Sequence, residues 1–243
     1  VEALIRWHHP QQGLLLPAAF MPALQGETLL VEVGEWVLDA ALAQLARWRE
    51  QGLSIPISVN VDAAHLQHPQ FMDQLKFTLT RHPQLKPGEL ELEILETSAL
   101  DDIPTVSRLM RECRDIGIGF ALDDFGTGYA SLTYLRRLPA HLLKIDQSFV
   151  RNMLEDPEDL AILEGVLGLA KAFRRKVIAE GVETVAHGQV LLQLGCDWGQ
   201  GLAIAPPMCA AQVPHWLASW RPDPRWLSPE PIVQVLEPAS AHA

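Results

Sequence analysis

Cysteine is scarce in this sequence, and its spacing argues against two kinds of site. Only three of the 243 residues are cysteines, at positions 113, 196 and 209. They form neither a CxxC pair nor a disulfide framework, a pattern that is typical of proteins in a reducing compartment. Cys113 lies among apolar residues at helical spacing, so we interpret it as a buried packing residue rather than a reactive thiol.

Long hydrophobic runs are also lacking. No stretch reaches the roughly 18 to 20 apolar residues of a membrane helix, and the first residues, Val1 to Leu4, do not have the pattern of a secretion signal. We therefore predict a soluble domain in the cytoplasm, while a membrane anchor elsewhere in the parent protein stays open.

Positive charge is in short supply. The sequence has 19 lysines and arginines against 30 aspartates and glutamates, with a formal net charge of -11 and no run of basic residues. This balance argues against binding to long nucleic acid polymers. A small anionic ligand is compatible with it if metal ions offset the carboxylates. No two histidines have HxxxH spacing, so we predict no histidine-ligated metal.

Apolar periodicity predicts strands that alternate with helices. Strand-like runs occupy residues 57–59, 90–94, 120–122, 142–143 and 177–179, and helical patterns occupy residues 29–48, 71–79, 106–116 and 160–173. The length suits one barrel or two small domains, and the lack of a linker within residues 1–220 favours one α/β barrel. The tail, residues 221–243, contains five prolines, and we expect it to be extended rather than helical.

The buried faces and the ends of several helices can be anticipated. In the helix at 29–48, a stripe that includes Leu30, Trp36 and Ala40 is expected to face the core. Asp101 or Asp102 is expected to cap the helix around 106–116, and Thr184 is expected to start the helix that follows it.

Most of the polar residues suited to bind metal or phosphate stand where a strand-like run gives way to a loop. They are Glu2, Asn60, Glu93, Asp123, Asp124, Lys144 and Glu180. The C-terminal ends of parallel barrel strands all open onto one face of the barrel. Groups that are far apart in the sequence can therefore meet in one pocket.

The segment from Asp123 to Tyr129, DDFGTGY, is the strongest local signal. Adjacent strand residues point to opposite faces, so both aspartates can serve one site only if the chain turns there, and Gly126 and Gly128 permit such a turn. One carboxylate that bridges two cations, next to a second carboxylate, is a usual way to hold a metal pair about 3.5–4 Å apart. An aspartate-rich capping turn is the alternative interpretation.

Charged residues inside apolar strands need partners. Glu91 and Glu93 share one face of their strand, and an inward carboxylate requires a cation or hydrogen bonds, although a solvent-facing acidic edge would give the same pattern. Burying the charge of Lys144 in an apolar strand costs free energy unless the ammonium contacts carboxylates or phosphate. The amide oxygen of Asn60 among these acids favours magnesium or manganese over zinc.

Taken together, these segments resemble the EAL domain family of cyclic di-GMP phosphodiesterases. The matching pieces, in family order over roughly residues 1–210, are Glu2-Ala3-Leu4 with Arg6-Trp7, Ser58-Val59-Asn60, Glu93-Ile94-Leu95-Glu96, the segment from Asp123 to Tyr129, Lys144-Ile145-Asp146, Glu180-Gly181-Val182-Glu183-Thr184 and Gly199-Gln200-Gly201. The resemblance implies a (β/α)8 TIM-like barrel of the EAL type. It also implies hydrolysis of cyclic di-GMP to linear pGpG with two Mg²⁺ or Mn²⁺ ions.

The resemblance also implies a role for each matching residue. Glu2, Asn60, Glu93 and Asp123 would hold the first metal, and Asp123, Asp124 and Glu180 the second. Lys144 would orient the attacking water, with Glu180 as the partner for its proton. Glu96, just past a strand end, is expected in a loop near the site and is counted with Lys144, Glu180 and Gln200 as a candidate catalytic residue. Arg6 and Glu183 would contact the substrate, and Gln200 would bind substrate or metal-held water.

The sequence departs from the family pattern in three places. The chain begins at the EAL motif, so the family's first strand and helix either precede the numbered residues or are absent. Ala130 replaces a common serine, and Leu202-Ala203 replaces an aromatic stretch. The last two changes flank the expected ligands, so they predict altered ligand packing rather than lost chemistry.

Two further features of the family concern partners and regulation. Members often dimerise, and the residues after Tyr129, which include Leu132, Tyr134 and Leu135, could supply such a surface, although a buried helix has the same pattern. A sensory or GGDEF domain is expected in the parent protein.

Two other functions stay open. The first is a receptor that binds cyclic di-GMP without cleaving it, for which loss of an acid such as Glu2 is the expected mark; no such acid is lost. The second is a carboxylate–metal barrel that acts on a small sugar or acid, which does not explain Arg6.

Overall fold

The computed structural model describes residues 1–24, 28–128 and 132–227. The chain forms two compact units, Val1–Asp123 with Gly128–His141, and Asp124–Thr127 with Leu142–Ala243. One boundary between the units lies between two adjacent residues of the same strand, Asp123 and Asp124, so the division does not follow a linker.

Four parallel strands form the sheet of the first unit, in the order β1-β4-β5-β6. They are β1 (Glu2–Ala3), β4 (Ile57–Asn60), β5 (Leu90–Leu95) and β6 (Gly119–Phe125). The last two residues of β6, Asp124 and Phe125, belong to the second unit. The strands predicted at 57–59, 90–94 and 120–122 are confirmed. An antiparallel hairpin, β2 (Trp7–His9) with β3 (Gly13–Leu15), was not predicted.

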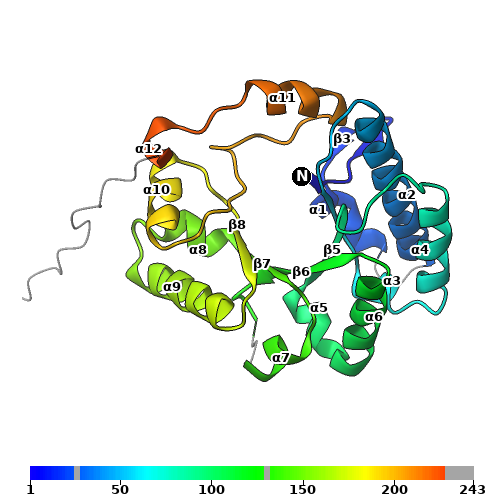
Figure 1. The fold of residues 1–243 in the computed structure, drawn as a ribbon, viewed down its shortest axis with the longest axis horizontal. Helices are drawn as coiled ribbons and strands as arrows, with labels where there is room; N and C mark the ends of the chain where they lie inside the picture. Colours follow the sequence, from blue (N-terminus) through cyan, green and yellow to red (C-terminus); the bar gives the residue numbers. More distant parts are fainter. Residues whose placement is uncertain (25–27, 129–131, 228–243) are drawn as a thin grey trace, which may run out of the picture. The chain divides into compact units, whose positions relative to one another are not determined.

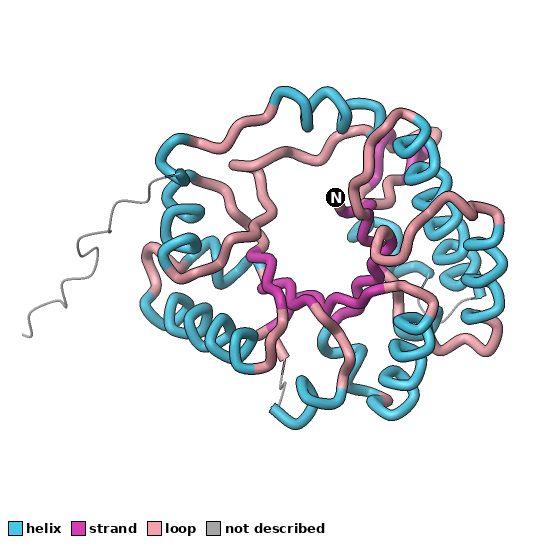
Figure 2. Tube along the Cα trace, viewed as in Figure 1, coloured by secondary structure: helices cyan, strands magenta, loops and turns pink. Residues whose placement is uncertain are grey.

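Helices of the first unit follow these strands in the chain, and Figure 2 shows the alternation in magenta and cyan. They are α1 (Pro17–Phe20), the 3-10 helix η1 (Met21–Leu24), α2 (Thr28–Glu50), α3 (Ala63–Leu66), α4 (Phe71–Thr80), α5 (Glu96–Asp101), α6 (Ile103–Asp115) and α7 (Leu132–Arg137). Helix α2 packs against β4 and lies beside α4 (Figure 1). Within the described ranges, no helix has the length and apolar character needed to cross a membrane.

The buried face of α2 differs in part from the predicted stripe. Leu30 and Leu38 are buried, but Trp36 is 61% exposed and Ala40 is also exposed. The prediction was wrong at these two positions because α2 is apolar over a wider arc than the sheet and α4 cover.

Two local predictions around α6 are confirmed. Asp102 is the N-cap, and its side chain accepts a hydrogen bond from the backbone N–H of Thr105 at 3.2 Å. Cys113 is fully buried, with its Sγ 3.5 Å from Sδ of Met72. Burial raises the pKa of the Cys113 thiol to about 12, so it is an unreactive packing residue.

The second unit has two parallel strands and helices around them. The strands are β7 (Leu142–Ile145) and β8 (Lys176–Ala179), and the helices are α8 (Gln147–Asn152), α9 (Pro157–Ala172), α10 (Val185–Gln193), the 3-10 helix η2 (Ala210–Gln212), α11 (Val213–Ser219) and α12 (Pro224–Leu227). Helix α9 lies beside α8 and packs on both strands (Figure 1). Thr184 caps α10, as predicted, by accepting a hydrogen bond from the backbone N–H of His187.

The tail is not wholly extended, so that prediction was wrong in part. Pro224 begins the one-turn helix α12, where the missing N–H of proline costs no hydrogen bond. Trp226 of this helix packs against Gly188 and donates a hydrogen bond from Nε1 to the Val185 carbonyl at 2.9 Å. Residues 228–243 lie outside the described ranges.

The predicted dimer surface can be assessed at one residue. Leu135 is 3% exposed, which favours the alternative of a buried helix at that position. Tyr129 lies outside the described residues, and the side chains of Leu132 and Tyr134 are outside the described part as well.

A substitution that creates a cavity in β5, the strand that carries Glu93, should lower the stability of the fold. Leu92 is fully buried in the centre of β5, so Leu92→Ala should lower the free energy of unfolding by about 2 to 5 kcal/mol. Leu95 ends the same strand and is 45% exposed, so Leu95→Ala should cost less than about 1 kcal/mol. Urea unfolding of both variants measures the difference, and equal losses would contradict this core assignment.

Candidate active site

The register of the first sheet places four predicted metal ligands on one face. Glu2 pairs with Ser58, Asn60 with Glu93, and Glu93 also with Ala121. Paired residues of adjacent strands point to the same side, and positions two apart along a strand share that side. Glu2, Asn60, Glu93 and Asp123 therefore lie on the same face, at or near the C-terminal ends of β1, β4, β5 and β6.

Two of these side chains are in direct contact, and two are buried. Nδ2 of Asn60 donates a hydrogen bond to Oε1 of Glu2 at 2.7 Å, which leaves the amide oxygen of Asn60 to act as a ligand. Glu93 is 2% exposed and Asp123 is 8% exposed. Glu93 is therefore not part of a solvent-facing acidic edge, and its carboxylate needs the compensation that hydrogen bonds or a cation provide.

The predicted turn after Asp123 begins within the strand itself. Asp124 has φ +52°, in the left-handed region, and Gly126 has φ +104°. This change of backbone direction frees Asp124 from the strict alternation of side chains along a strand. A Cβ at Gly126 would lie 3.0 Å from the ring of Phe149, so a side chain there would be crowded as well as strained.

Glu96 does not lie in a loop, which corrects the prediction for this residue. It is the first residue of α5 and is 2% exposed. The strand β5 passes directly into the helix, so the residue after the strand end is already helical. Its Oε1 faces Gly128, where a Cβ would lie only 2.6 Å from that atom.

In the second unit, an ion pair joins two predicted catalytic residues. Nζ of Lys144 lies 2.7 Å from Oε1 of Glu180, and the lysine side chain is 1% exposed. Glu180 directly follows β8, and its carboxylate and that of Asp124 place oxygen atoms within 4.8 Å of one another. A lysine and two carboxylates thus meet at the C-terminal end of this pair of strands.

The loop after β8 is held by several hydrogen bonds. The backbone N–H of Gln200 donates to the Ala179 carbonyl at 2.8 Å, and the Gln200 carbonyl accepts from Val182 at 3.0 Å. The carboxylate of Glu183 pairs with Nε of Arg151 at 2.6 Å, and the Glu183 N–H donates to Nδ1 of His187 at 3.3 Å.

Sequence reasoning missed both partners of Glu183. The position of His187, three residues after the capping Thr184, is the spacing of a capping box and could have pointed to it. The position of Arg151 carried no comparable signal.

Arg6 follows Glu2 closely in the sequence, and a cavity of the first unit has Asn60 in its lining. Nη1 of Arg6 donates a hydrogen bond to the carbonyl of Ile5 at 2.8 Å. The cavity, of ≈ 290 Å³, is lined by Asn60, Asp62, His65 and apolar residues that include Leu4 and Pro17. Burial lowers the pKa of His65 to about 4, so a neutral imidazole faces this space at neutral pH.

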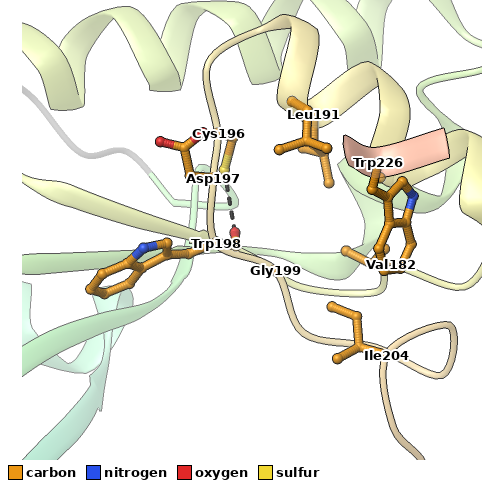
Figure 3. Close-up of a pocket in the computed structure, with 10 residues that line it drawn as sticks. Val182, Leu191, Cys196, Asp197, Trp198, Gly199, Ile204 and Trp226 are labelled. Atoms are coloured by element: carbon orange, nitrogen blue, oxygen red, sulfur yellow. Dashed lines mark hydrogen bonds between the residues drawn. The ribbon is translucent and has the colours of Figure 1, made fainter. Parts of the chain in front are cut away.

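The second unit has a smaller cavity, of ≈ 70 Å³. Figure 3 shows the side chains of Val182, Leu191, Ile204 and Trp226 around it, with the backbone of Gly199 passing between them. Sγ of Cys196 donates to the Trp198 carbonyl at 3.4 Å, and burial raises the pKa of this thiol. No predicted site residue lines this cavity, so we interpret it as a packing space beside the Gln200 loop.

The donor set fits hard divalent cations. All the candidate ligands offer oxygen, as carboxylates or as the amide of Asn60, which suits Mg²⁺ or Mn²⁺ better than zinc. Asp124 and Glu180 bring carboxylate oxygens close enough to share one ion. In the first unit, the buried Glu93 carries negative charge that a cation bound there would offset.

The comparisons identify relatives along most of the chain. A family model described as "EAL domain" matches residues 1–207. MucR of Pseudomonas aeruginosa, named a bifunctional diguanylate cyclase/cyclic di-GMP phosphodiesterase, is 41% identical over 214 residues, which are 88% of this chain and 31% of the relative. The cyclic di-GMP phosphodiesterase PA2567 of the same species is 38% identical over 89% of this chain and 37% of the relative. The chain thus spans about a third of the length of these curated relatives.

Solved structures show the same fold. The structure titled "PaMucR Phosphodiesterase, c-di-GMP complex" matches with a TM-score of 0.84 and 41% identity, over 88% of this chain and 86% of that one. The FimX EAL domain from Pseudomonas aeruginosa bound to c-di-GMP matches with a TM-score of 0.78 and 26% identity, over 85% of this chain and 82% of that one. These matches confirm the predicted fold class, an α/β barrel of the EAL type.

Proposed function

Because this chain belongs to the EAL domain family, we propose that it is a metal-dependent phosphodiesterase that hydrolyses cyclic di-GMP to linear pGpG. The observation that carries the proposal is the meeting of Lys144, Glu180 and Asp124 at the end of β7 and β8. Burying a lysine beside two carboxylates costs desolvation free energy, and a catalytic role would explain why the charged groups are there. The names of MucR and PA2567 support the substrate.

We propose that the chain binds two metal ions through the residues that match the ligands of the EAL family. Glu2, Asn60, Glu93 and Asp123 would hold one ion, and Asp123, Asp124 and Glu180 a second.

The chain's own residues would orient the reactants. Bound Mg²⁺ or Mn²⁺ ions would offset charge on the phosphate and favour deprotonation of the attacking water. The ammonium of Lys144 can donate a hydrogen bond to that water, and Glu180, its partner at 2.7 Å, can accept a proton. Arg6 offers a guanidinium for a phosphate oxygen, and Gln200 an amide for water or substrate.

Two residues have less direct support for the roles predicted from the sequence. Glu183 is paired with Arg151, so contact with the substrate would compete with this ion pair. Glu96 is buried against Gly128 at the start of α5, from where it can support the loop after Asp123. We propose that Glu96 acts through this loop and not on the substrate itself.

The cavity beside Asn60 is suited to part of the ligand. Its walls are mostly apolar side chains, with Asn60, Asp62 and His65 as polar groups. A flat purine can stack on apolar walls while polar groups contact its edge. We therefore propose that one guanine of cyclic di-GMP enters this space, next to the ligands Glu2 and Asn60.

The purified chain should convert cyclic di-GMP to pGpG in the presence of Mn²⁺ or Mg²⁺. Excess EDTA should reduce the rate to background, and returning Mn²⁺ should restore it, because the oxygen ligands hold the ions reversibly. Chromatography of the nucleotide products measures the rate. Cyclic GMP is the matched control and should remain intact if the site selects a cyclic dinucleotide.

The outcomes of this experiment separate the candidate functions. Binding of cyclic di-GMP by calorimetry without formation of pGpG would favour the receptor that senses the nucleotide. Hydrolysis of simple sugar or carboxylic acid substrates, without binding of cyclic di-GMP, would favour the third function. If the folded protein shows neither binding nor turnover of cyclic di-GMP, the proposal is rejected.

We propose further that the domain acts within a larger regulated protein. MucR, named as both a cyclase and a phosphodiesterase, is matched over 31% of its length. An attached sensory or GGDEF domain and a homodimer are expectations that fit this relative.

A further inference from the structure

The loop from Glu180 to Thr184 joins β8 to α10 and carries two predicted site residues, Glu180 and Glu183. The backbone N–H of Glu180 donates to the Ile145 carbonyl at 3.1 Å, and that of Val182 donates to the Gln200 carbonyl at 3.0 Å. Both acceptors are main-chain groups, so any sequence with this fold could provide them. The N–H of Glu183 is different, because its acceptor is the side chain of His187.

His187 makes two hydrogen bonds that tie the loop to the start of α10. Its own N–H donates to Oγ1 of Thr184 at 3.2 Å, and its Nδ1 accepts from the N–H of Glu183 at 3.3 Å. In a capping box, the side chain at the third helical position bonds back to the N–H of the capping residue. Here the bond reaches one residue further, to Glu183, so the cap extends into the loop.

Side chains of two helices therefore contact Glu183. His187 on α10 holds its backbone, and Arg151 on α8 holds its carboxylate at 2.6 Å. Gly181, with φ +72°, lies against Gln147 of α8, where a Cβ would be 2.8 Å from the Gln147 side chain. The loop is thus clamped between α8 and α10, and Glu180 at its start is aligned with Lys144.

We propose that His187 is a positioning residue for the phosphodiesterase reaction, acting through the backbone of Glu183 on the loop that presents Glu180. This inference rests on the proposed function. His187 is 6% exposed, so neighbouring atoms limit the motion of its imidazole. Nδ1 can accept a hydrogen bond only in the neutral imidazole with its proton on Nε2.

The fold itself does not depend on this hydrogen bond. Glu183 is exposed, so water can replace the lost acceptor. The cap uses the hydroxyl of Thr184 and the backbone N–H of His187, so it survives substitution of the His187 side chain. With the Glu183 N–H bonded to water instead of His187, the loop should sample more positions. The alignment of Glu180 with Lys144 should then be less exact in the transition state.

Two substitutions at this position separate positioning from packing. His187→Leu fills the buried site but has no acceptor, and it should lower kcat about tenfold with less than about a threefold change in KM. His187→Asn places its Oδ1 where Nδ1 lies, and it should retain kcat within about threefold of wild type. Trp226→Phe is the matched control, because it removes a different hydrogen bond to the same turn of α10, the one to Val185, and it should leave kcat unchanged.

Hydrogen exchange tests the same inference without relying on catalysis. Mass spectrometry of peptides that cover residues 180–184 should show faster amide exchange in His187→Leu than in wild type, with His187→Asn close to wild type. Faster exchange with unchanged kcat, or equal exchange in all variants, overturns the inference while wild-type turnover upholds the proposed function. If wild type forms no pGpG, the proposed function fails, and the exchange data alone decide whether His187 holds the loop.

Discussion

Glu93→Gln is expected to reduce turnover of cyclic di-GMP at least about 100-fold, which is about 2.7 kcal/mol of lost transition-state stabilisation. Glutamine keeps the shape of the side chain but removes the charge that would hold a divalent ion. Glu93 is 2% exposed and shares a face with Glu2, Asn60 and Asp123, so its carboxylate has little access to bulk water as an alternative partner. Initial rates at several Mn²⁺ concentrations measure the effect.

The loss should come from metal binding and not from unfolding. Without metal, Glu93→Gln should change the free energy of unfolding by less than about 1.5 kcal/mol, because the amide can still form hydrogen bonds. In the wild type, Mn²⁺ should raise the melting temperature through preferential binding to the folded state, and this rise should shrink in the variant.

Glu91 offers a matched control for Glu93. It lies two residues earlier on the same strand and on the same face, but its Oε2 contacts Nε2 of His141 at 2.8 Å. Glu91→Gln should therefore retain turnover within about threefold of wild type. Wild-type rates and Mn²⁺ affinity in Glu93→Gln, or equal losses in both variants, would contradict the assignment of Glu93 as a ligand.

Lys144→Met is expected to lower kcat by about 100-fold or more while Mn²⁺ binding is largely kept. Methionine fills the buried space of the lysine stem but cannot donate a hydrogen bond to water or to Glu180. Since Lys144 is 1% exposed and lies 2.7 Å from Glu180, solvent is poorly placed to supply the missing donor. Steady-state kinetics together with calorimetric titration of Mn²⁺ separate the effect on kcat from the effect on metal binding.

Lys176 tests whether the effect is specific to Lys144. It begins the neighbouring strand β8, and its Nζ lies 4.5 Å from the ring centroid of Trp198. Lys176→Met should leave kcat within about twofold of wild type, because it removes a lysine from the N-terminal end of the strand. If Lys144→Met lost Mn²⁺ binding in parallel with kcat, Lys144 would be supporting the metal ligands and not orienting water.

Much of the fold could be predicted because its signals are local. The strands at 57–59, 90–94 and 120–122 and the helices at 71–79 and 160–173 follow from apolar periodicity, and each appears near its predicted position. The caps at Asp102 and Thr184 could be predicted because a short polar side chain next to a helical pattern satisfies the free N–H groups of the first turn.

The errors arose where neighbours decide burial or where the chain changes conformation. Trp36 is apolar and correctly spaced, yet it is exposed because nothing in the described part of the chain covers that side of α2. Glu96 was placed in a loop, but α5 begins at that residue without a connecting turn. One turn of helix forms at Pro224 despite the nearby prolines, because proline is tolerated at the first helical position.

The sequence by itself determined which residues are candidates for the chemistry, because acids, Asn60 and Lys144 in or after apolar strands are unusual enough to be recognised without coordinates. Only the tertiary structure decided which of them meet. The pairings of Lys144 with Glu180 and of Arg151 with Glu183 depend on the register of β7 with β8 and on where α8 lies beside the loop after β8. Contacts between residues far apart in the chain leave no periodic pattern in the sequence, so only the three-dimensional structure shows them.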